Sequence, residues 1–246
     1  MRFAAIADVH GNALALSAVL ADIQRMGVDQ VVNLGDHVSG PLAAARVADL
    51  LMECDFPSIQ GNCDRALFAV AAANLGPSDK AANAQLTPRH RAWLQAMPPT
   101  LVFRDEVFLC HGTPASDTTY WLERVTADGV VRMASHAEID VEAKGCNYPL
   151  ILCAHTHIPR AVRLKDGRMI VNPGSVGLPA YDHDIPVPHV METGTPDARY
   201  AILEKAGADW SVAFRQVRYD NVAMATMARA AGRAEWASAL ATGWAR

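Results

Sequence analysis

The sequence predicts an α/β protein, and three observations support this fold class. Over residues 3–60, short apolar runs of strand length alternate with segments whose apolar residues recur at helical spacing. Further apolar runs, joined by short turns, occupy the second half of the chain. Polar residues follow several of these runs directly, where a strand would end and a loop begin. Alternating strands and helices imply a parallel sheet with right-handed crossovers.

The first part of the chain predicts three strands separated by two helices. The expected elements are a strand at 3–7, a helix at 13–26, a strand at 30–34, a helix at 43–54 and a short strand at 57–60. Gly27 is suited to end the first helix because glycine readily adopts the left-handed conformation found there. Residues 64–97 are Ala-rich and predict a small helical block, in which Asp64 would cap a helix that begins at Arg65.

The second part of the chain predicts mainly hairpins. Strands are expected at 100–103, 107–110, 150–153, 161–164, 168–171, 199–203 and 210–217. Residues 113–147 predict mixed loop and helix, residues 181–197 a Pro-rich loop, and residues 221–244 an Ala-rich helical tail. No repeat or low-complexity linker divides the chain, so we expect a single domain over residues 1–246.

The composition narrows the classes of function. Hydrophobic residues make up 51 % of the chain and charged residues 20 %, which is ordinary for a globular protein. The net charge of −4 offers no overall attraction for nucleic acid or anionic lipid. No apolar run approaches the roughly 18–20 residues of a membrane helix, so we expect no membrane association. The five cysteines form no CxxC motif or paired framework, which predicts reduced thiols and a cytoplasmic location.

Seven candidate metal ligands follow strand-like runs, in five short blocks. The blocks are Asp8-Val9-His10, Gly35-Asp36, Gly61-Asn62-Cys63-Asp64, His111-Gly112 and His155-Thr156-His157. The carboxyl ends of strands are where open α/β sheets bind ligands. Two divalent cations about 3.5–4 Å apart are a common device for in-line attack on phosphorus. The mixture of oxygen and nitrogen ligands suits two transition metals (Mn, Fe, Zn, Co or Ni) better than calcium.

The spacing within the blocks is compatible with shared metals. Strand alternation places residues i and i+2 on the same side, so Asp8 and His10 can reach one metal. His155 and His157 have the same spacing, although a bend after the strand could send them to different metals. Taken alone, each block can also be interpreted as an ordinary structural feature, such as a capping Asp or a turn Asn. The ordered set, with every block at a predicted strand end, favours a metal centre.

The set resembles the calcineurin-like metallophosphoesterase superfamily, with a match from Asp8 to about Ser175. The superfamily pattern is D-x-H, G-D, G-N-H-[DE], an H-G block and a G-H-x-H block. The resemblance implies a four-layer α-β-β-α sandwich with a small helical insertion. It also implies one metal held by Asp8, His10, Asp36 and His157, and a second held by Asp36, Asn62, His111 and His155. Asp36 would then bridge the two metals.

Two positions depart from the superfamily pattern. Ala154 replaces the usual glycine before the His pair, which is a minor change. Cys63 stands where many members carry a His that contacts the phosphate and protonates the leaving group. Gly-Asn-Cys-Asp, together with Asn172-Pro173-Gly174-Ser175, is similar to the YfcE-like phosphodiesterase branch. The Asn-Pro-Gly-Ser segment is interpreted equally well as a tight turn or as part of the phosphate site.

The resemblance implies a phosphoesterase that hydrolyses phosphodiesters or phosphomonoesters with a metal-bridging hydroxide. The residues expected to carry catalysis are Asp36, Asn62, His37 and Asp64. His37 could replace the missing acid or could be a loop residue that points away. Asp64 could orient a ligand or simply cap its helix. Cys63 is not expected to be a nucleophile, because nothing near it in sequence would activate the thiol. Without a His at position 63, we expect a preference for good leaving groups.

The expected partner is a small phosphorylated substrate, with nucleotides among the candidates. Tyr120 or Trp121 could stack a base or pack in the core, and the 181–197 segment could cover the site or lie idle. One alternative is a dinucleotide polyphosphate hydrolase or protein phosphatase of the same superfamily. Another is a catalytically weak or inactive scaffold, a use of the fold known from a retromer subunit. Nothing in the sequence specifies the physiological substrate, the native metal or the oligomeric state.

Overall fold

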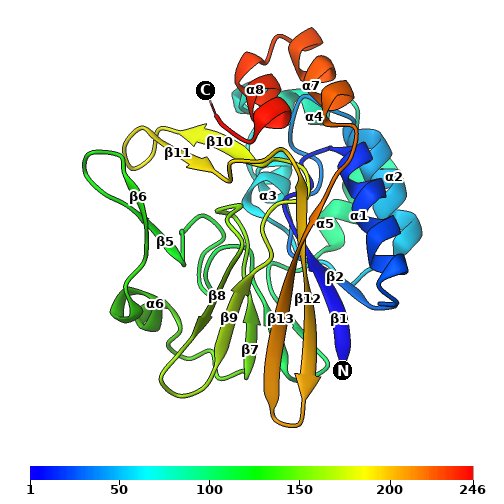
Figure 1. Ribbon diagram of the computed structural model, residues 1–246. Coiled ribbons are helices and arrows are strands. Elements are labelled where there is room, and N and C mark those ends of the chain that lie inside the picture. The colour runs from blue at the N-terminus through cyan, green and yellow to red at the C-terminus, as the bar shows by residue number, and fades with distance from the viewer. Residues whose placement is uncertain (246) are drawn as a thin grey trace.

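Two β-sheets packed face to face form the centre of the protein in a computed structural model that describes residues 1–245 (Figure 1). The first sheet has the order β13-β12-β1-β2, with β1 (Arg2–Ile6), β2 (Val31–Asn33), β12 (Ala198–Ala206) and β13 (Asp209–Val217). Strand β1 runs parallel to β2 and antiparallel to β12. The second sheet has the order β3-β4-β7-β9-β8, with β3 (Leu101–Phe103), β4 (Val107–Leu109), β7 (Leu150–Leu152), β8 (Arg160–Arg163) and β9 (Met169–Asn172). In that sheet, β4, β7 and β9 are parallel.

Strand β1 shows how the sequence separates the layers. Its side chains alternate, because Phe3 and Ala5 enter the core between the two sheets, whereas Ala4 and Ile6 face the helices. Helices α1 (Ala13–Arg25) and α2 (Ala44–Cys54) cover that outer face. Helix α6 (His136–Glu142) and the buried Trp121 pack on the outer face of the second sheet. The four-layer α-β-β-α sandwich implied by the family resemblance is therefore confirmed.

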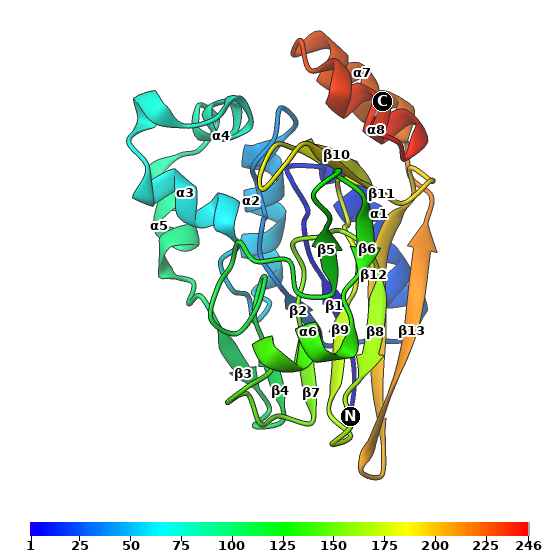
Figure 2. The same cartoon turned by 90° about the vertical axis from the view of Figure 1, so that its left-hand side faces the viewer.

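Additional elements gather at the end of the sandwich where the parallel strands finish. Helices α3 (Asn62–Ala69), α4 (Pro77–Asn83) and α5 (Pro88–Ala96), with the 3₁₀ turn Ala72–Asn74, form the expected helical insertion (Figure 2). Two hairpins, β5–β6 (Glu123–Val125 and Val131–Met133) and β10–β11 (Ala180–His183 and His189–Glu192), extend from the second sheet. The C-terminal helices α7 (Asn221–Ala230) and α8 (Ala234–Thr242) lie over β10–β11. In residues 1–245, none of the helices has both the length and the apolar character required for a membrane span.

Four local predictions differ from the structure. Residues 181–197 are not a loop, because most of this segment forms the β10–β11 hairpin, whose prolines lie in the turn and whose Met191 is buried. Residues 57–60 form only an isolated bridge, between Asn33 and Ser58. Helix α3 begins at Asn62 with Gly61 as its N-cap, so Asp64 is the third residue of the helix and not its cap. The β5–β6 hairpin lies in a segment where mixed loop and helix were expected.

Candidate metal centre

The seven predicted ligands converge at the carboxyl ends of the parallel strands. Asp8 and His10 follow β1, Asp36 follows β2, His111 follows β4, and His155 and His157 follow β7. Asn62 is the first residue of α3. Two tight groups with ligand atoms within 4.8 Å of one another result, namely Asp8, His10 and His157, and Asp8, Asp36 and His111. Both groups are buried and share Asp8, so the chain brings the two halves of the predicted centre into contact.

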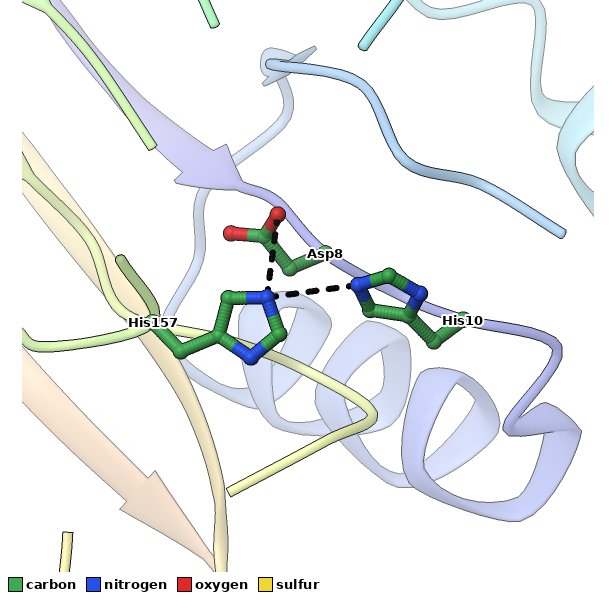
Figure 3. A group of neighbouring side chains, drawn as sticks. All are labelled: Asp8, His10 and His157. Carbon is green, nitrogen blue, oxygen red and sulfur yellow. Dashed lines mark hydrogen bonds and ion pairs between the residues drawn. The ribbon is translucent and has the colours of Figure 1, made fainter. Parts of the chain in front are cut away.

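The first group presents two unprotonated imidazole nitrogens to each other (Figure 3). His10 Nδ1 lies 2.9 Å from the carbonyl oxygen of Ser39, and His157 Nδ1 lies 2.7 Å from that of Leu178. A carbonyl oxygen only accepts, so both Nδ1 atoms carry hydrogen, and in the neutral rings both Nε2 atoms carry lone pairs. These Nε2 atoms are 3.2 Å apart, and His157 Nε2 is 3.5 Å from Asp8 Oδ1. Two facing lone pairs beside a carboxylate fit a shared cation.

The second group places Asp36 between histidines of both groups. Asp36 Oδ2 lies 3.4 Å from His111 Nε2 and 3.8 Å from His10 Nε2. His111 Nδ1 donates to the carbonyl oxygen of Leu34 at 2.7 Å, which directs Nε2 toward the carboxylates. Among residues 1–245, His111 Nε2 and both oxygens of Asp8 have no hydrogen-bond partner. Buried polar atoms without partners are costly, and cations would satisfy these ones. Asp36 Oδ2 thus lies between His10 of the first group and His111 of the second.

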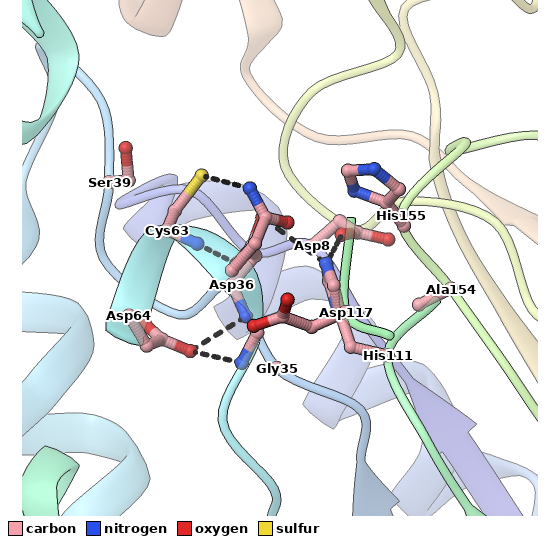
Figure 4. A network of polar contacts seen from close by, with 12 residues as sticks. Asp8, Gly35, Asp36, Ser39, Cys63, Asp64, His111, Asp117, Ala154 and His155 are labelled. Carbon is pink, nitrogen blue, oxygen red and sulfur yellow. Dashed lines mark hydrogen bonds and ion pairs between the residues drawn. The ribbon is translucent and has the colours of Figure 1, made fainter. Parts of the chain in front are cut away.

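Asn62 and His155 border these groups without belonging to them. Figure 4 shows His155 beside His111. The side-chain oxygen of Asn62 is buried and has no hydrogen-bond partner within residues 1–245, as expected for an oxygen ligand. His155 Nε2 lies 3.2 Å from the carbonyl oxygen of Thr118, which leaves Nδ1 as the available nitrogen. The His155 ring lies 5.2 Å from the His111 ring and 5.0 Å from the Tyr120 ring. Both residues thus fit the second predicted metal position by placement and by donor atom.

Five of the candidate ligands adopt a left-handed backbone that residues other than glycine usually avoid. The φ angles are 53° at Asp8, 48° at His10, 55° at Asp36, 70° at His155 and 62° at His157. Each such residue costs on the order of 1–2 kcal/mol, and strain of this kind concentrates at functional sites. Strand β1 ends at Ile6, so strand alternation does not explain why Asp8 and His10 meet. Their pairing was predicted correctly, but its cause is a tight left-handed turn.

Asp64 holds the Asp36 loop in place. Its carboxylate accepts hydrogen bonds from the backbone nitrogens of Asp36, His37 and Gly61 at 2.8, 3.1 and 3.0 Å. His37 Nδ1 also lies 2.7 Å from Asp64 Oδ2, and the His37 ring packs against Trp93. His37 is fully buried and does not line the cavity at the centre. This geometry favours a positioning role for His37 and Asp64 over proton donation to a substrate.

Gly61 lets the start of α3 approach Asp36 closely. A Cβ at Gly61 would overlap Asp36 Oδ1, and a Cβ at Gly35 would overlap the backbone of Gly61. Two residues after Gly61, Cys63 donates its backbone N–H to Asp36 Oδ1 at 2.9 Å. One oxygen of Asp36 is therefore fixed by α3, while the other faces His10 and His111.

The electrostatic environment keeps the acidic ligands ionised and keeps His155 neutral. Burial alone would raise the pKa of Asp36, but neighbouring histidines, His111 first among them, hold that pKa well below its ordinary value. The pKa of Asp8 is lowered in the same way, mainly by His157 against the effect of burial. Burial, reinforced by His111, lowers the pKa of His155 to about 3. Burial alone would lower the pKa of His111, but Asp36 and Asp8 raise that pKa to about 10. Ionised carboxylates and neutral imidazoles are the forms that bind metals, so a bound cation would displace the His111 proton.

The thiol of Cys63 faces the cavity but is unreactive. Burial, followed by the charges of Asp36 and Asp79, raises its pKa well above the ordinary value. A thiol that stays protonated is a poor nucleophile, in agreement with the prediction for this residue. It is also too weak an acid to replace an imidazolium.

A cavity of about 280 Å³ opens onto the centre and includes five of the seven ligands in its wall. Tyr120 lines this cavity, and it also lines a neighbouring one of about 650 Å³. Trp121 is buried in the core, as the packing interpretation expected. Residues Tyr181, Asp182 and His183 of β10 border the cavity, so the 181–197 segment does lie at the site. No sequence pattern predicted that Ser39, Leu34 and Leu178 would orient the histidines, since they act through backbone carbonyl oxygens.

The Asn-Pro-Gly-Ser segment ties ligand loops together. Asn172 donates to the carbonyl oxygen of Ala154 at 2.9 Å, and Ser175 Oγ donates to that of Asp8 at 2.8 Å. Both residues are buried, and neither lines the cavity. The geometry favours a structural role, in which this turn fixes the loops that carry Asp8 and His155.

Comparisons with known proteins agree with the fold. The calcineurin-like phosphoesterase superfamily domain matches residues 1–194. The uncharacterized protein MJ0912 of Methanocaldococcus jannaschii is 23 % identical over 239 residues, a match that covers 88 % of this chain and 87 % of that protein.

Two solved structures are similar over nearly the whole chain. A metallophosphoesterase from Sphaerobacter thermophilus has a TM-score of 0.73 at 25 % identity, covering 96 % of this chain and 100 % of the other. Hypothetical protein PH1004 from Pyrococcus horikoshii OT3 has a TM-score of 0.76 at 19 % identity, covering 98 % of each chain. With the family match over residues 1–194, these findings show that the chain belongs to the calcineurin-like phosphoesterase superfamily.

Proposed function

We propose that the protein is a phosphoesterase that uses two divalent transition metals to hydrolyse small phosphodiesters or phosphomonoesters, nucleotides among them. The observation that carries this proposal is the position of Asp36 Oδ2, 3.8 Å from His10 Nε2 and 3.4 Å from His111 Nε2. A single carboxylate oxygen between two outward-facing imidazoles is the arrangement that a bridged metal pair requires. Manganese, iron, zinc, cobalt and nickel all suit the mixed oxygen and nitrogen donors.

The ligands divide into two sets that share Asp36. One metal would be held by Asp8, His10, Asp36 and His157, and the other by Asp36, Asn62, His111 and His155. When bound, the metals would supply a water of lowered pKa and positive charge for the phosphoryl oxygens. The protein contributes by fixing the ligands, since carbonyl oxygens orient three of the histidines and Asp64 holds the Asp36 loop. Loss of such supporting contacts typically lowers metal affinity or activity 10–100-fold.

The leaving group receives little help from the protein. Position 63 supplies a thiol whose pKa lies well above its ordinary value, and His37 is buried against Asp64. We therefore expect fast turnover only for esters of acidic alcohols and phenols. The five free cysteines fit a reducing compartment, and we propose the cytoplasm as the location of the enzyme.

Metal analysis followed by an ester screen tests this function. Purified protein should contain up to two transition metals per chain, and with added Mn²⁺ it should release p-nitrophenol from bis-p-nitrophenyl phosphate. The screen should include p-nitrophenyl phosphate, diadenosine tetraphosphate and a phosphopeptide, which separate the diesterase from the other phosphatase classes. Protein that binds metal but turns over no ester would support the scaffold alternative and reject the proposal.

A further inference from the structure

The C-terminal helices contribute one wall of the cavity. Arg233, Glu235, Trp236 and Ala245 line it opposite the metal ligands, although the family match ends at residue 194. Helix α8 packs through an apolar cluster that includes Leu42, Leu178 and Ala180. This wall comes from residues beyond the family match, and it faces the space in which a substrate would lie.

Trp236 fixes this wall against the metal site. Its side chain is buried, and its ring meets the His10 ring edge to face with the centroids 6.0 Å apart. A Cβ at Gly40 would lie 2.6 Å from Trp236 Cη2, so the indole packs directly on the loop that follows Asp36. An aromatic surface held in this way is suited to pack against the organic part of a bound ester.

Arg233 extends the same wall with a permanent positive charge. Its Cζ lies 5.8 Å from the Trp236 ring centroid, and its side chain is 20 % exposed. Arg233 Nε contacts Glu235 at 2.5 Å, and Nη1 donates to Ser78 Oγ at 3.0 Å. Among residues 1–245, Nη2 has no hydrogen-bond partner. The guanidinium is thus held on two of its nitrogens, and the third is available to a ligand.

The charges around the cavity direct an anion to this position. Arg233 is the only basic residue of the lysine or arginine type among the described residues that line the cavity. Asp79 and Asp182 also line it, and their carboxylates disfavour an anion beside them, whereas Glu235 pairs with Arg233 and offsets part of its charge. Arginine recognises carboxylates and phosphates through its planar set of N–H donors.

We propose that Arg233 binds a second anionic group of the substrate, a carboxylate or a phosphate, on the arm distal to the reacting phosphorus. Trp236 packs against the arm that joins the two groups. This inference rests on the proposed function for the position of the reacting phosphorus. It narrows the substrate class to esters that carry a further negative charge beyond the scissile bond.

Binding of phosphonates tests this inference without requiring turnover. The probes are phosphonates whose alkyl chain ends in a carboxylate, compared with alkylphosphonates of equal length that end in a methyl group. A third set ends in a second phosphonate, which separates recognition of phosphate from recognition of carboxylate. Binding to Mn²⁺-supplemented protein is measured by titration calorimetry over several chain lengths, because the arm must span from the ligands past Trp236.

The wild-type protein should bind one anionic chain length roughly tenfold more tightly than its methyl-ended counterpart, as a charge-assisted hydrogen bond implies. Arg233→Met should abolish this preference and leave the affinity for the methyl-ended probe unchanged. Arg233→Lys, which keeps the charge, should retain part of it. Arg229→Met is the matched control, since Arg229 is exposed on α7 and lies outside the cavity wall.

Two results overturn the inference. If phosphonates bind but no chain length shows a preference for the anion-ended probe that depends on Arg233, then Arg233 does not bind a second anionic group. If Arg233→Met weakens both probe types equally while its thermal unfolding matches wild type, its role is general and not specific to the anionic arm. Failure of every phosphonate to bind wild-type protein would instead reject the proposed metal centre together with the inference.

Discussion

His10 and His157 present Nε2 atoms to each other at 3.2 Å, while each ring donates its Nδ1 hydrogen to a backbone carbonyl oxygen. Neither nitrogen can donate to the other in the neutral rings, so the pair has no favourable direct contact. The arrangement becomes favourable when both lone pairs point at one cation. The backbone strain at both residues, with φ angles of 48° and 62°, is consistent with a site held for binding and not for stability.

Asp64→Asn tests the positioning role of Asp64. The variant loses a charged acceptor for the backbone nitrogens of Asp36, His37 and Gly61. We expect metal affinity or activity to fall roughly 10–100-fold, as for other residues that orient metal ligands. Metal titration and turnover of bis-p-nitrophenyl phosphate provide the measurement. Unchanged affinity and rate would show that Asp64 only stabilises the start of α3.

Gly61→Ala tests the close approach of α3 to Asp36. A Cβ at this position overlaps the Asp36 carboxylate, so metal binding should be lost and the protein destabilised. Gly76→Ala is the matched control, because Gly76 is also a helix N-cap and its Cβ would meet nothing nearer than 4.0 Å. Metal content and thermal unfolding of both variants provide the readout. Equal behaviour of the two variants would contradict the steric argument.

Cys63→His tests whether the missing proton donor limits the range of substrates. The half-buried Cys63 side chain lines the cavity, so an imidazole there could reach the leaving group. We expect methyl p-nitrophenyl phosphate to show little change and dialkyl phosphates to react faster by about 10²-fold, the lower end of general acid catalysis. Cys63→Ser serves as the control for size. An equal gain for good and poor leaving groups would rule out protonation as the cause.

Asp22 gives the stability of the fold a pH dependence independent of the metal centre. Burial alone would raise its pKa, but hydrogen bonds from Tyr200, Arg25 and Arg215 lower the pKa below its ordinary value of 3.8. Because the folded-state pKa is the lower one, the carboxylate stabilises the protein above about pH 4, and this stabilisation is lost as the pH falls through the folded-state value.

Asp22→Asn should therefore lower the free energy of unfolding at pH 7 by about 1–3 kcal/mol, the range for hydrogen bonds to charged groups. The difference from wild type should shrink below pH 4. Urea unfolding at both pH values measures it, with Asp29→Asn as an exposed control in the loop that follows α1. A difference that does not change with pH would assign the effect of Asp22 to packing.

Much of the fold was predictable because its signals are local. The alternation of Phe3, Ala4, Ala5 and Ile6 identifies a strand buried on both faces, and the ligand blocks mark the strand ends. The β10–β11 hairpin was missed because its prolines and polar residues resemble a loop, whereas its Ala180 and Val190 pack against the distant C-terminal helices. The N-cap of α3 was predicted three residues too late, at Asp64. The actual N-cap is Gly61, which has no side chain to signal a cap.

The seven candidate ligands were predictable as a set, but the contacts that orient and surround them were not. Asp8 and His157 are far apart in sequence and meet only when both sheets are assembled. The carbonyl oxygens of Ser39 and Leu178 orient histidines without any side-chain signature. Arg233 and Trp236 reach the cavity from a tail that reads as an ordinary Ala-rich helical segment. Contacts of this kind depend on tertiary packing, which local patterns do not encode.

The metal content of wild-type protein and of Asp36→Asn, measured by plasma mass spectrometry on samples of equal thermal stability, tests the central claim most directly. We predict two transition metals per wild-type chain and at most one in the variant, together with loss of phosphodiester turnover. Wild-type protein that binds no metal, or a variant that retains two metals and full turnover, would contradict a metal pair bridged by Asp36.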